Sequence, residues 1–443
     1  MKKLLLLTSV IVLAACSADY MKPNEEVKYV TKNSFKVSEE DAIERIEKML
    51  NVFDIATRGN TRTIKEIIPH VRPQTRAYAA EIPDTMYYYV NFDNNDGYAI
   101  VAADERSIPI LALIDTGNYV PPQSYFDWTE TFVDSLNSIY TLEEDDFWCF
   151  QHEATIKTVE FIDDLCEGYV SAIYNSPYVK DIVNFDVQFQ YGPYLKTSWG
   201  QDDPYNRMCT MNSMNLPYFY ASKGFYVGGC VAVAIAQIIN YHQYPLSYED
   251  QTFNWNLTKD QKHVTSTTQT NIITEVARLI KAAGRASDTS YGEQASSSNI
   301  RKAKRAFRDE FGYTVDKKSG FNAYDIRKSL QNQEPVFFAG KKNSHSGGHA
   351  WVIDGYRSCK VQTWKVAYRD DTYTEELEKA LIDEYSDYFY HCNFGWDGNA
   401  NGYYAGDIFR LNEGPAMLDD IDTVTVHVDE KWWKFKNIFV EKP

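Results

Sequence analysis

Proline and glycine are scarce in this sequence of 443 residues, with 15 and 22 copies, and no hydrophobic run after residue 15 is long enough to cross a membrane. That composition excludes collagen-like and low-complexity chains, and with 44% hydrophobic residues the chain can bury cores in two to three domains. Basic residues are also in the minority, since 45 Lys and Arg stand against 62 Asp and Glu and give a net charge of −17. Phosphate contacts need clustered Lys and Arg, so the charge argues against a nucleic-acid partner.

Several common catalytic motifs are missing as well. The sequence has no Gly-x-x-x-x-Gly-Lys phosphate loop, no His-Glu-x-x-His zinc helix, no Cys-x-x-Cys pair and no Gly-x-Ser-x-Gly elbow. His345 and His349 are four residues apart, but Gly347 and Gly348 between them oppose the helix that a metal-binding pair would need. We therefore expect neither a metal site nor a cofactor.

The first residues have the pattern of a secretory signal. Lys2 and Lys3 precede an apolar run over 4–15, which is too short for a membrane-spanning helix. The run ends in Leu-Ala-Ala-Cys16, which resembles the bacterial lipobox and implies a lipid anchor at Cys16. We interpret 1–16 as the signal and 17–35 as a tether, and we expect the protein in the bacterial cell envelope, anchored in the outer membrane or at the cell surface. A plain signal peptide with an incidental cysteine is the alternative.

That compartment permits disulfides. Seven cysteines become six after lipidation, and six could form three bridges. The pair to test first is Cys149 with Cys166.

The N-terminal third has the pattern of a small α+β unit over 36–145. Ser38 is a suitable N-cap for an amphipathic helix of about four turns. The segments 86–92 and 98–103 flank a turn-forming cluster and predict a β-hairpin, and 108–114 continues the sheet. The aromatic and acidic stretch 146–190 is interpreted as a connecting region.

The rest of the chain places helices before strands, which indicates an α+β domain. Apolar positions at helical spacing predict helices over 231–241, 272–283 and 300–311. Short apolar runs predict strands over 336–339, 350–353, 388–392 and 424–428.

Cys230 is the strongest candidate for chemistry. It follows Gly228 and Gly229 and opens the helix that is predicted over 231–241. Unsatisfied backbone N–H groups and the helix dipole at that position favour the nucleophilic thiolate, and the glycines let a substrate backbone approach. A small buried core cysteine is the competing interpretation.

Two further segments could complete a catalytic group. Gly347 and Gly348 place His349 at the start of an apolar strand, where it could take the thiol proton and pass it to a leaving amine. In a later segment, Asn393 could orient that histidine and Trp396 could shield the contact from water. A structural histidine and an ordinary core tryptophan are the alternatives.

These segments resemble the streptopain family of cysteine proteases, in the papain superfamily. The stretch from Cys230 to Pro245 is similar to the nucleophile helix of that family, 348–355 to its histidine strand, and 393–398 to its Asn-Trp-Gly-Trp-Gly-Gly turn. Gln201 falls where the family carries its oxyanion-hole glutamine. Matching stretches run in family order over about residues 190 to 412.

The resemblance implies a fold and an activity. The fold class is α+β, with a papain-like catalytic domain, a helical part plus an antiparallel sheet part, over 186–443. The segment 96–111 resembles the family's inhibitory propeptide, which makes 36–185 a prodomain with its connecting region. The expected function is a secreted cysteine endopeptidase made as a zymogen. Its partners are protein or peptide substrates and its own prodomain, which would inhibit it intramolecularly by displacing His349 from Cys230. A binding domain that stays attached is the alternative for the N-terminal unit.

Two positions depart from the family pattern. Phe394 stands in place of the first Trp of the turn, and Asp397 in place of a Gly. A backbone carbonyl contact from position 394 to His349 would survive the change, whereas a role that needs an indole there would not. An inactive surface binding protein and a papain-like amidase or transferase remain as other functions.

Overall fold

The computed structural model describes the chain from residue 36 onward, in segments that all belong to the compact unit Phe35–Pro443. Described are 36–120, 178–209, 225–341, 348–406, 409 and 434–442, with gaps at 56–58, 60, 72–84, 104, 106–107 and 293–294. The predictions for Cys16, the tether, the pair Cys149 and Cys166, and the strand 424–428 lie outside these residues. No helix in the described part is long and apolar enough to cross a membrane.

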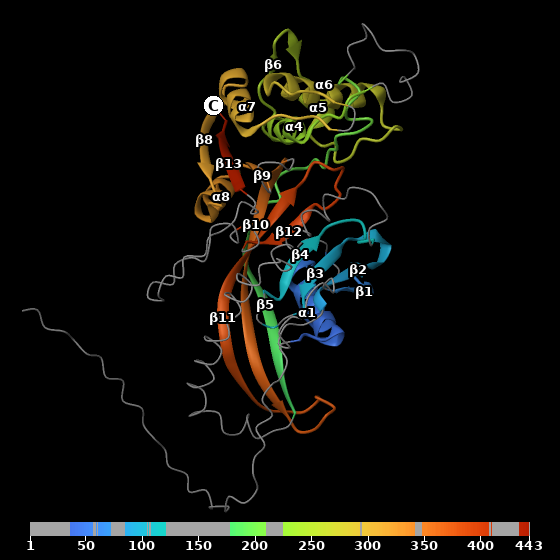
Figure 1. Ribbon diagram of the computed structural model, residues 1–443, viewed down its shortest axis with the longest axis vertical. Coiled ribbons are helices and arrows are strands. Elements are labelled where there is room, and N and C mark those ends of the chain that lie inside the picture. The colour runs from blue at the N-terminus through green and yellow to red at the C-terminus, as the bar shows by residue number, and fades with distance from the viewer. Residues whose placement is uncertain are drawn as a thin grey trace, which may run out of the picture. The chain divides into compact units, whose positions relative to one another are not determined.

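The N-terminal unit begins with α1 (Glu39–Phe53), where the Ser38 side chain accepts a hydrogen bond from the backbone of Asp41 at 3.1 Å and caps the helix. Four antiparallel strands follow in sequence order, so the predicted helix, hairpin and third strand are confirmed (Figure 1). They are β1 (Ile64–Val71), β2 (Thr85–Phe92), β3 (Tyr98–Ala102) and β4 (Ile110–Ile114), and a short 3-10 turn (Asp93–Asn95) joins β2 to β3.

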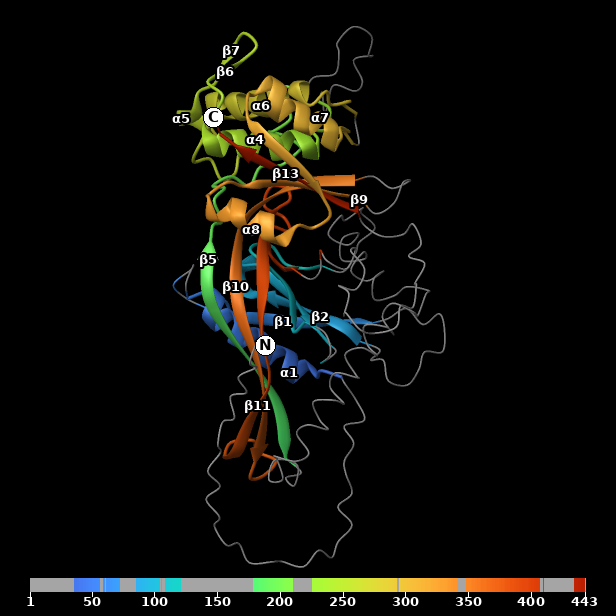
Figure 2. The ribbon, with the colours of Figure 1, turned by 90° about the vertical axis from the view of Figure 1, so that its left-hand side faces the viewer.

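The helices of the C-terminal part group together at one end of the molecule, as Figures 1 and 2 show. They are α4 (Cys230–His242), α5 (Trp255–Thr258), α6 (Thr270–Ala286), α7 (Ile300–Arg305) and, beside the sheet, α8 (Ala323–Gln331). The helices predicted over 231–241 and 272–283 are confirmed. The one predicted over 300–311 is α-helical only to Arg305 and ends in a π-helical turn, Ala306–Glu310.

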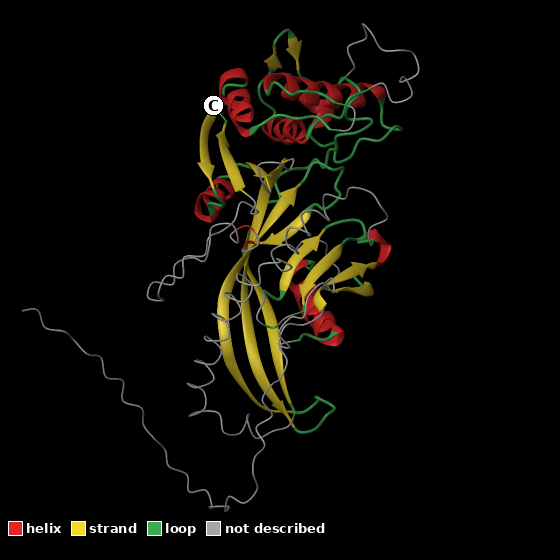
Figure 3. Cartoon of the chain, in the orientation of Figure 1, coloured by secondary structure: helices red, strands yellow, loops and turns green. Residues whose placement is uncertain are grey.

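The ladders between the described strands are all antiparallel, and one large sheet runs through both parts of the chain in the order β1-β2-β3-β4-β12-β11-β10-β9-β13-β8 (Figure 3). A small hairpin is separate from it. The remaining strands are β5 (Val179–Tyr191), β6 (Ser247–Tyr248), β7 (Gln251–Thr252), β8 (Thr314–Ser319), β9 (Val336–Lys341), β10 (Gly348–Tyr368), β11 (Glu376–Asn393), β12 (Gly402–Ala405) and β13 (Lys434–Glu441). Helices on an antiparallel sheet confirm the α+β class.

The sequence predicted a connecting region over 146–190, but its described part forms a strand. This strand, β5, pairs with β10 along its whole length. Apolar residues alternate with polar ones there, and Val183 and Phe185 are buried. This is the two-residue period of a half-buried strand, which the acidic composition concealed. The boundary placed at 185/186 falls inside this strand.

Each face of the central sheet packs against a different core. On β10, Ala350 and Val352 belong to the core formed with α4 and α6, whereas Trp351 and Ile353 belong to the core that includes α1 and the N-terminal strands. Successive side chains of a strand point to opposite faces, so these four residues alternate between the two cores.

The N-terminal strands join the sheet at the edge of β12. Ile114 at the end of β4 lies opposite Gly402, and Leu113 lies opposite Tyr403. A Cβ atom at Gly402 would lie 2.4 Å from the carbonyl oxygen of Leu113, so only glycine allows this close approach.

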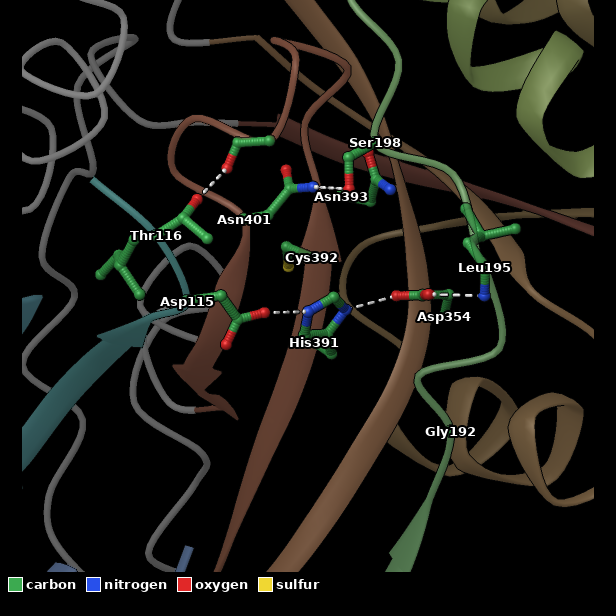
Figure 4. A network of polar contacts seen from close by, with 12 residues as sticks. Asp115, Thr116, Gly192, Leu195, Ser198, Asp354, His391, Cys392, Asn393 and Asn401 are labelled. Atoms are coloured by element: carbon green, nitrogen blue, oxygen red, sulfur yellow. Dashed lines mark hydrogen bonds and ion pairs between the residues drawn. The ribbon is translucent and has the colours of Figure 1, made fainter. Parts of the chain in front are cut away.

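A buried histidine is held between two carboxylates beside this junction (Figure 4). His391 on β11 contacts Asp354 of β10 through Nδ1 at 2.6 Å and Asp115, which directly follows β4, through Nε2 at 2.9 Å. Burial alone would lower the pKa of His391, but Asp354 and Asp115 outweigh it and raise the pKa to about 10. The ring is therefore an imidazolium that links the N-terminal unit to the C-terminal part.

We expect His391→Gln to destabilise the protein by about 3–5 kcal/mol near pH 6, since two carboxylates lose their buried cationic partner. The ordinary pKa of histidine lies near 6.5, and the folded value lies above it. The stabilisation by the charged ring is therefore fully present below about pH 6.5 and is lost as the pH rises toward about 10. Urea unfolding of both proteins between pH 6 and pH 10 measures the difference.

The matched control is His263→Gln, which removes a histidine that contacts Asp397 at 3.0 Å while both side chains are largely exposed. That change should cost at most about 1 kcal/mol. A destabilisation by His391→Gln that stays constant from pH 6 to pH 10 would contradict the charged state assigned to His391.

Candidate active site

Cys230 is the first residue of α4, as the sequence predicts. Gly229 before it has a φ of 91°, which favours glycine, and a Cβ atom there would crowd the Cβ of Ser296 at 3.2 Å. The N–H of Gly228 donates to the carbonyl of Gln201 at 2.8 Å. The backbone of Gln201 thus lies against Gly228, two residues before the start of α4.

The thiol of Cys230 is half-buried and packs against the core of α4 and α6. Burial raises its pKa, and hydrogen bonds from the backbone of Ala350, Val231 and Cys230 itself offset only part of that effect. In this arrangement the protonated thiol is favoured over the thiolate.

His349 is buried near the start of β10 with its ring on that of Trp396, at a centroid distance of 4.4 Å. Its Nε2 lies 2.9 Å from the carbonyl oxygen of Phe394. A carbonyl only accepts hydrogen bonds, so Nε2 carries the proton and Nδ1 is the basic nitrogen. Burial lowers the pKa of His349 to about 4, although the Phe394 carbonyl raises it in part. The ring is therefore neutral at ordinary pH.

The Cys230 thiol lies beside the residue that directly follows His349 on β10. Ala350, whose backbone contacts the Cys230 sulfur, packs with α4. His349 is one residue earlier, and its ring stacks with Trp351 at 5.9 Å on the other face of the strand. The pKa of each group is set by burial and by backbone partners rather than by the other group.

Asn393 does not make the contact with His349 that the sequence analysis expected. Its Nδ2 donates to the carbonyl of Thr197 at 2.7 Å, and its Oδ1 accepts from Gln237 at 3.1 Å and from the N–H of Gly395 at 3.3 Å. These three bonds direct the amide toward α4, and the carbonyl of Phe394 holds the histidine instead.

Trp396 and the two departures from the family pattern lie in the same turn. The half-buried indole of Trp396 covers His349 and stacks on Phe394 at 5.2 Å. Phe394 acts through its backbone, so the absent indole leaves the histidine contact intact, as expected. Asp397 has a φ of 56°, in the region where glycine is favoured and aspartate is tolerated, and its Oδ1 binds the hydroxyl of Tyr205 at 2.5 Å and His263 at 3.0 Å.

Sequence reasoning missed several residues of this region. Gln237 on α4 could have been found, because an amide within an otherwise apolar stretch of helix must have a buried partner. The pairing of Asp115 and Asp354 with His391 has no local signal, since the three residues come from distant strands. Within the described segments no cluster of His, Cys, Asp and Glu could hold a metal ion, and Cys209, Cys359 and Cys392 are buried free thiols.

Known proteins with similar sequences include streptopain and a thiol protease. Streptopain of Streptococcus pyogenes is 24% identical over 353 residues, which cover 72% of this chain and 73% of that protein. The thiol protease/hemagglutinin PrtT of Porphyromonas gingivalis is 21% identical over 360 residues, which cover 73% of this chain and 34% of that protein.

Two structures from Prevotella intermedia are also similar. A prointerpain A fragment is 19% identical to this chain, with a TM-score of 0.46. The match covers 85% of this chain and all of the fragment. Active interpain A is 21% identical to this chain, with a TM-score of 0.38. The match covers 56% of this chain and 94% of interpain A. The family model of the Peptidase C10 family matches residues 199–404. The matches to the Peptidase C10 family model and to streptopain confirm the resemblance of this chain to a streptopain-family cysteine protease.

Proposed function

We propose that this chain is a cysteine endopeptidase made as a latent zymogen, with Cys230 as nucleophile and His349 as general acid and base. The observation that carries the proposal is the placement of the Cys230 thiol at the N-terminus of a buried helix, in contact with the residue that follows His349. The match of residues 199–404 to the Peptidase C10 family supports the same reaction class.

In the assembled site, Nδ1 of His349 takes the proton of the Cys230 thiol, since Nε2 is engaged with Phe394. The thiolate attacks the peptide carbonyl, and the backbone N–H of Cys230 with the side chain of Gln201 binds the oxyanion. His349 then gives the proton to the leaving amine as the C–N bond breaks. A water molecule, deprotonated by His349, hydrolyses the thioester and releases the acid product.

We attribute latency to the charge states of Cys230 and His349. Burial raises the pKa of the Cys230 thiol and lowers that of His349 to about 4, so the neutral form of each group is favoured at pH 7. We expect activation when release of the N-terminal unit lets His349 and Cys230 form the ion pair, with Nε2 of His349 still bound to the carbonyl of Phe394.

The proposed role of the N-terminal unit is supported by its contact with the turn that binds His349. The N–H of Asp115 donates to the carbonyl of Asn401 at 2.8 Å, and Oδ1 of Asn401 accepts from the N–H of Phe394 at 2.9 Å. Phe394 in turn holds His349 through its carbonyl. Docking of β4 on β12 therefore orders the turn that binds the histidine, and the ion pair of Asp115 with His391 fastens that docking.

We place the maturation cut before Val179, because β5 pairs with β10 and belongs to the protease sheet. For the intact chain we propose a bacterial envelope location through a lipid on Cys16. A cut before Val179 would separate the protease from that anchor. The proposed substrates are proteins or peptides.

Replacing Cys230 with Ala should abolish peptide cleavage and self-processing, since no other group replaces the nucleophile. Gln201→Ala should lower kcat by about 10²- to 10³-fold, because one oxyanion donor is lost. The measurement follows the intact mass of the full-length protein under reducing conditions, together with hydrolysis of a peptide substrate after trimming by an added protease. Cleavage by the Cys230→Ala protein at the wild-type rate would refute the assignment of the nucleophile. If the trimmed wild type hydrolyses no peptide, an inactive binding protein or an amidase would be favoured.

Asp115→Asn should speed self-processing of the full-length chain by roughly 5- to 30-fold, because His391 loses one of its two carboxylates and the docking of β4 weakens. The rate of appearance of the processed mass measures the effect. Glu47→Gln is the matched control, since it removes an exposed carboxylate from the same unit and should leave the rate unchanged. Equal rates for Asp115→Asn and the wild type would remove this ion pair from the latency mechanism.

A further inference from the structure

One buried amide lies at the meeting point of the segments that carry the proposed catalytic residues. Gln237 on α4 is fully buried, and its Oε1 accepts from the hydroxyl of Thr197 at 3.0 Å and from the N–H of Trp199 at 3.1 Å. Its Nε2 donates to Oδ1 of Asn393 at 3.1 Å. A single side chain therefore binds the segment that leads to Gln201 and the turn that leads to Trp396.

The direction of each of these bonds is fixed by backbone partners. The N–H of Trp199 can only donate, so Oε1 of Gln237 faces it and Nε2 must face Asn393. The amide of Asn393 is fixed in the same way, because its Nδ2 meets the carbonyl of Thr197 and its Oδ1 meets the N–H of Gly395. The network therefore has one arrangement, and neither amide can turn over without two lost bonds.

The position of Gln237 on its helix explains why it reaches both segments. It follows Cys230 by seven residues, which is about two helical turns, so both lie on one face of α4. Val233 lies between them on this face, and a Cβ atom at Gly395 would lie 3.1 Å from its Cγ1. The turn after β11 thus packs directly on α4, and Gln237 supplies the polar bonds of that contact.

We propose that Gln237 is a positioning residue for the reaction, which sets the place of Gln201 and of the turn that binds His349 relative to Cys230. It touches no reacting atom and acts through Trp199 and Asn393. This inference rests on the proposed protease function and adds a residue to it.

The test compares two substitutions in the full-length chain, trimmed by an added serine protease that is then inactivated. Gln237→Met keeps the length of the side chain and removes all three bonds, and we expect kcat for a peptide substrate to fall about 10²-fold with KM changed less than about 2-fold. Gln237→Glu keeps an acceptor for Thr197 and Trp199 but loses the donor to Asn393 until its carboxyl is protonated. Its kcat should therefore recover as the pH falls, with an ionisation that the wild type lacks.

Asn240→Leu is the matched control. Asn240 is also a buried amide of α4, but its Nδ2 donates to the carbonyl of Thr258 at 3.4 Å, away from the site. We expect Asn240→Leu and Gln237→Met to lower the melting temperature by similar amounts, while only Gln237→Met lowers kcat. Equal kcat values for these two variants would overturn the positioning role.

A second measurement does not depend on peptide cleavage. The rate of alkylation of Cys230 by iodoacetamide, followed by mass spectrometry of the peptide that contains it, gives the pH midpoint of the thiol. In Gln237→Met the midpoint should rise, and in Asn240→Leu it should match the wild type; an unchanged midpoint in both contradicts the inference. If the wild type cleaves no peptide, the proposed function fails, and the alkylation profiles alone decide on Gln237.

Discussion

The structure depends on the burial of α4, a helix that is apolar on every side. All residues from Val231 to Asn240 are buried, between the sheet on one side and α6 on the other. Such a helix is stable only inside a core, because no face of it is suited to water. Enclosure fixes the helix in space and with it the thiol at its first residue. It also obliges the amides of Gln237 and Asn240 to find partners, since an unpaired buried amide is costly.

A second constraint is the continuity of the antiparallel sheet from β1 to β8. The N-terminal strands enter it at β12, and the turn between β11 and β12 contains both the carbonyl that binds His349 and Asn401, which accepts the backbone bond from Asp115. Docking of the N-terminal unit and placement of the histidine therefore depend on the same few residues. The path from the edge of β12 to His349 runs through the backbone bond from Asp115 to Asn401, the bond from the N–H of Phe394 to the Asn401 side chain, and the carbonyl of Phe394.

The parts that the sequence predicted are those encoded by local patterns. The cap at Ser38, the hairpin around 93–97, the helix after Cys230 and the strand after His349 each follow from residue type and spacing over one or two turns. The lengths of β10 and β11, and the pairing of β5 with β10, depend on contacts between distant segments. No local hydrophobic period in the sequence shows such contacts. The partner of His349 was missed for another reason. It is a backbone carbonyl, and every residue has one, so a search by side-chain chemistry selected Asn393 instead.

The same distinction explains why the two departures from the family pattern leave this site intact. Position 394 contributes its carbonyl to His349 and its side chain to the core, so phenylalanine serves as well as tryptophan for both purposes. Position 397 needs a residue that accepts a positive φ, and aspartate does so while its carboxylate binds Tyr205 and His263. What the turn must preserve is therefore the backbone path that Asn393 and Gly395 set against α4. Side chains within it can vary as long as that path, and the carbonyl it presents to the histidine, stay in place.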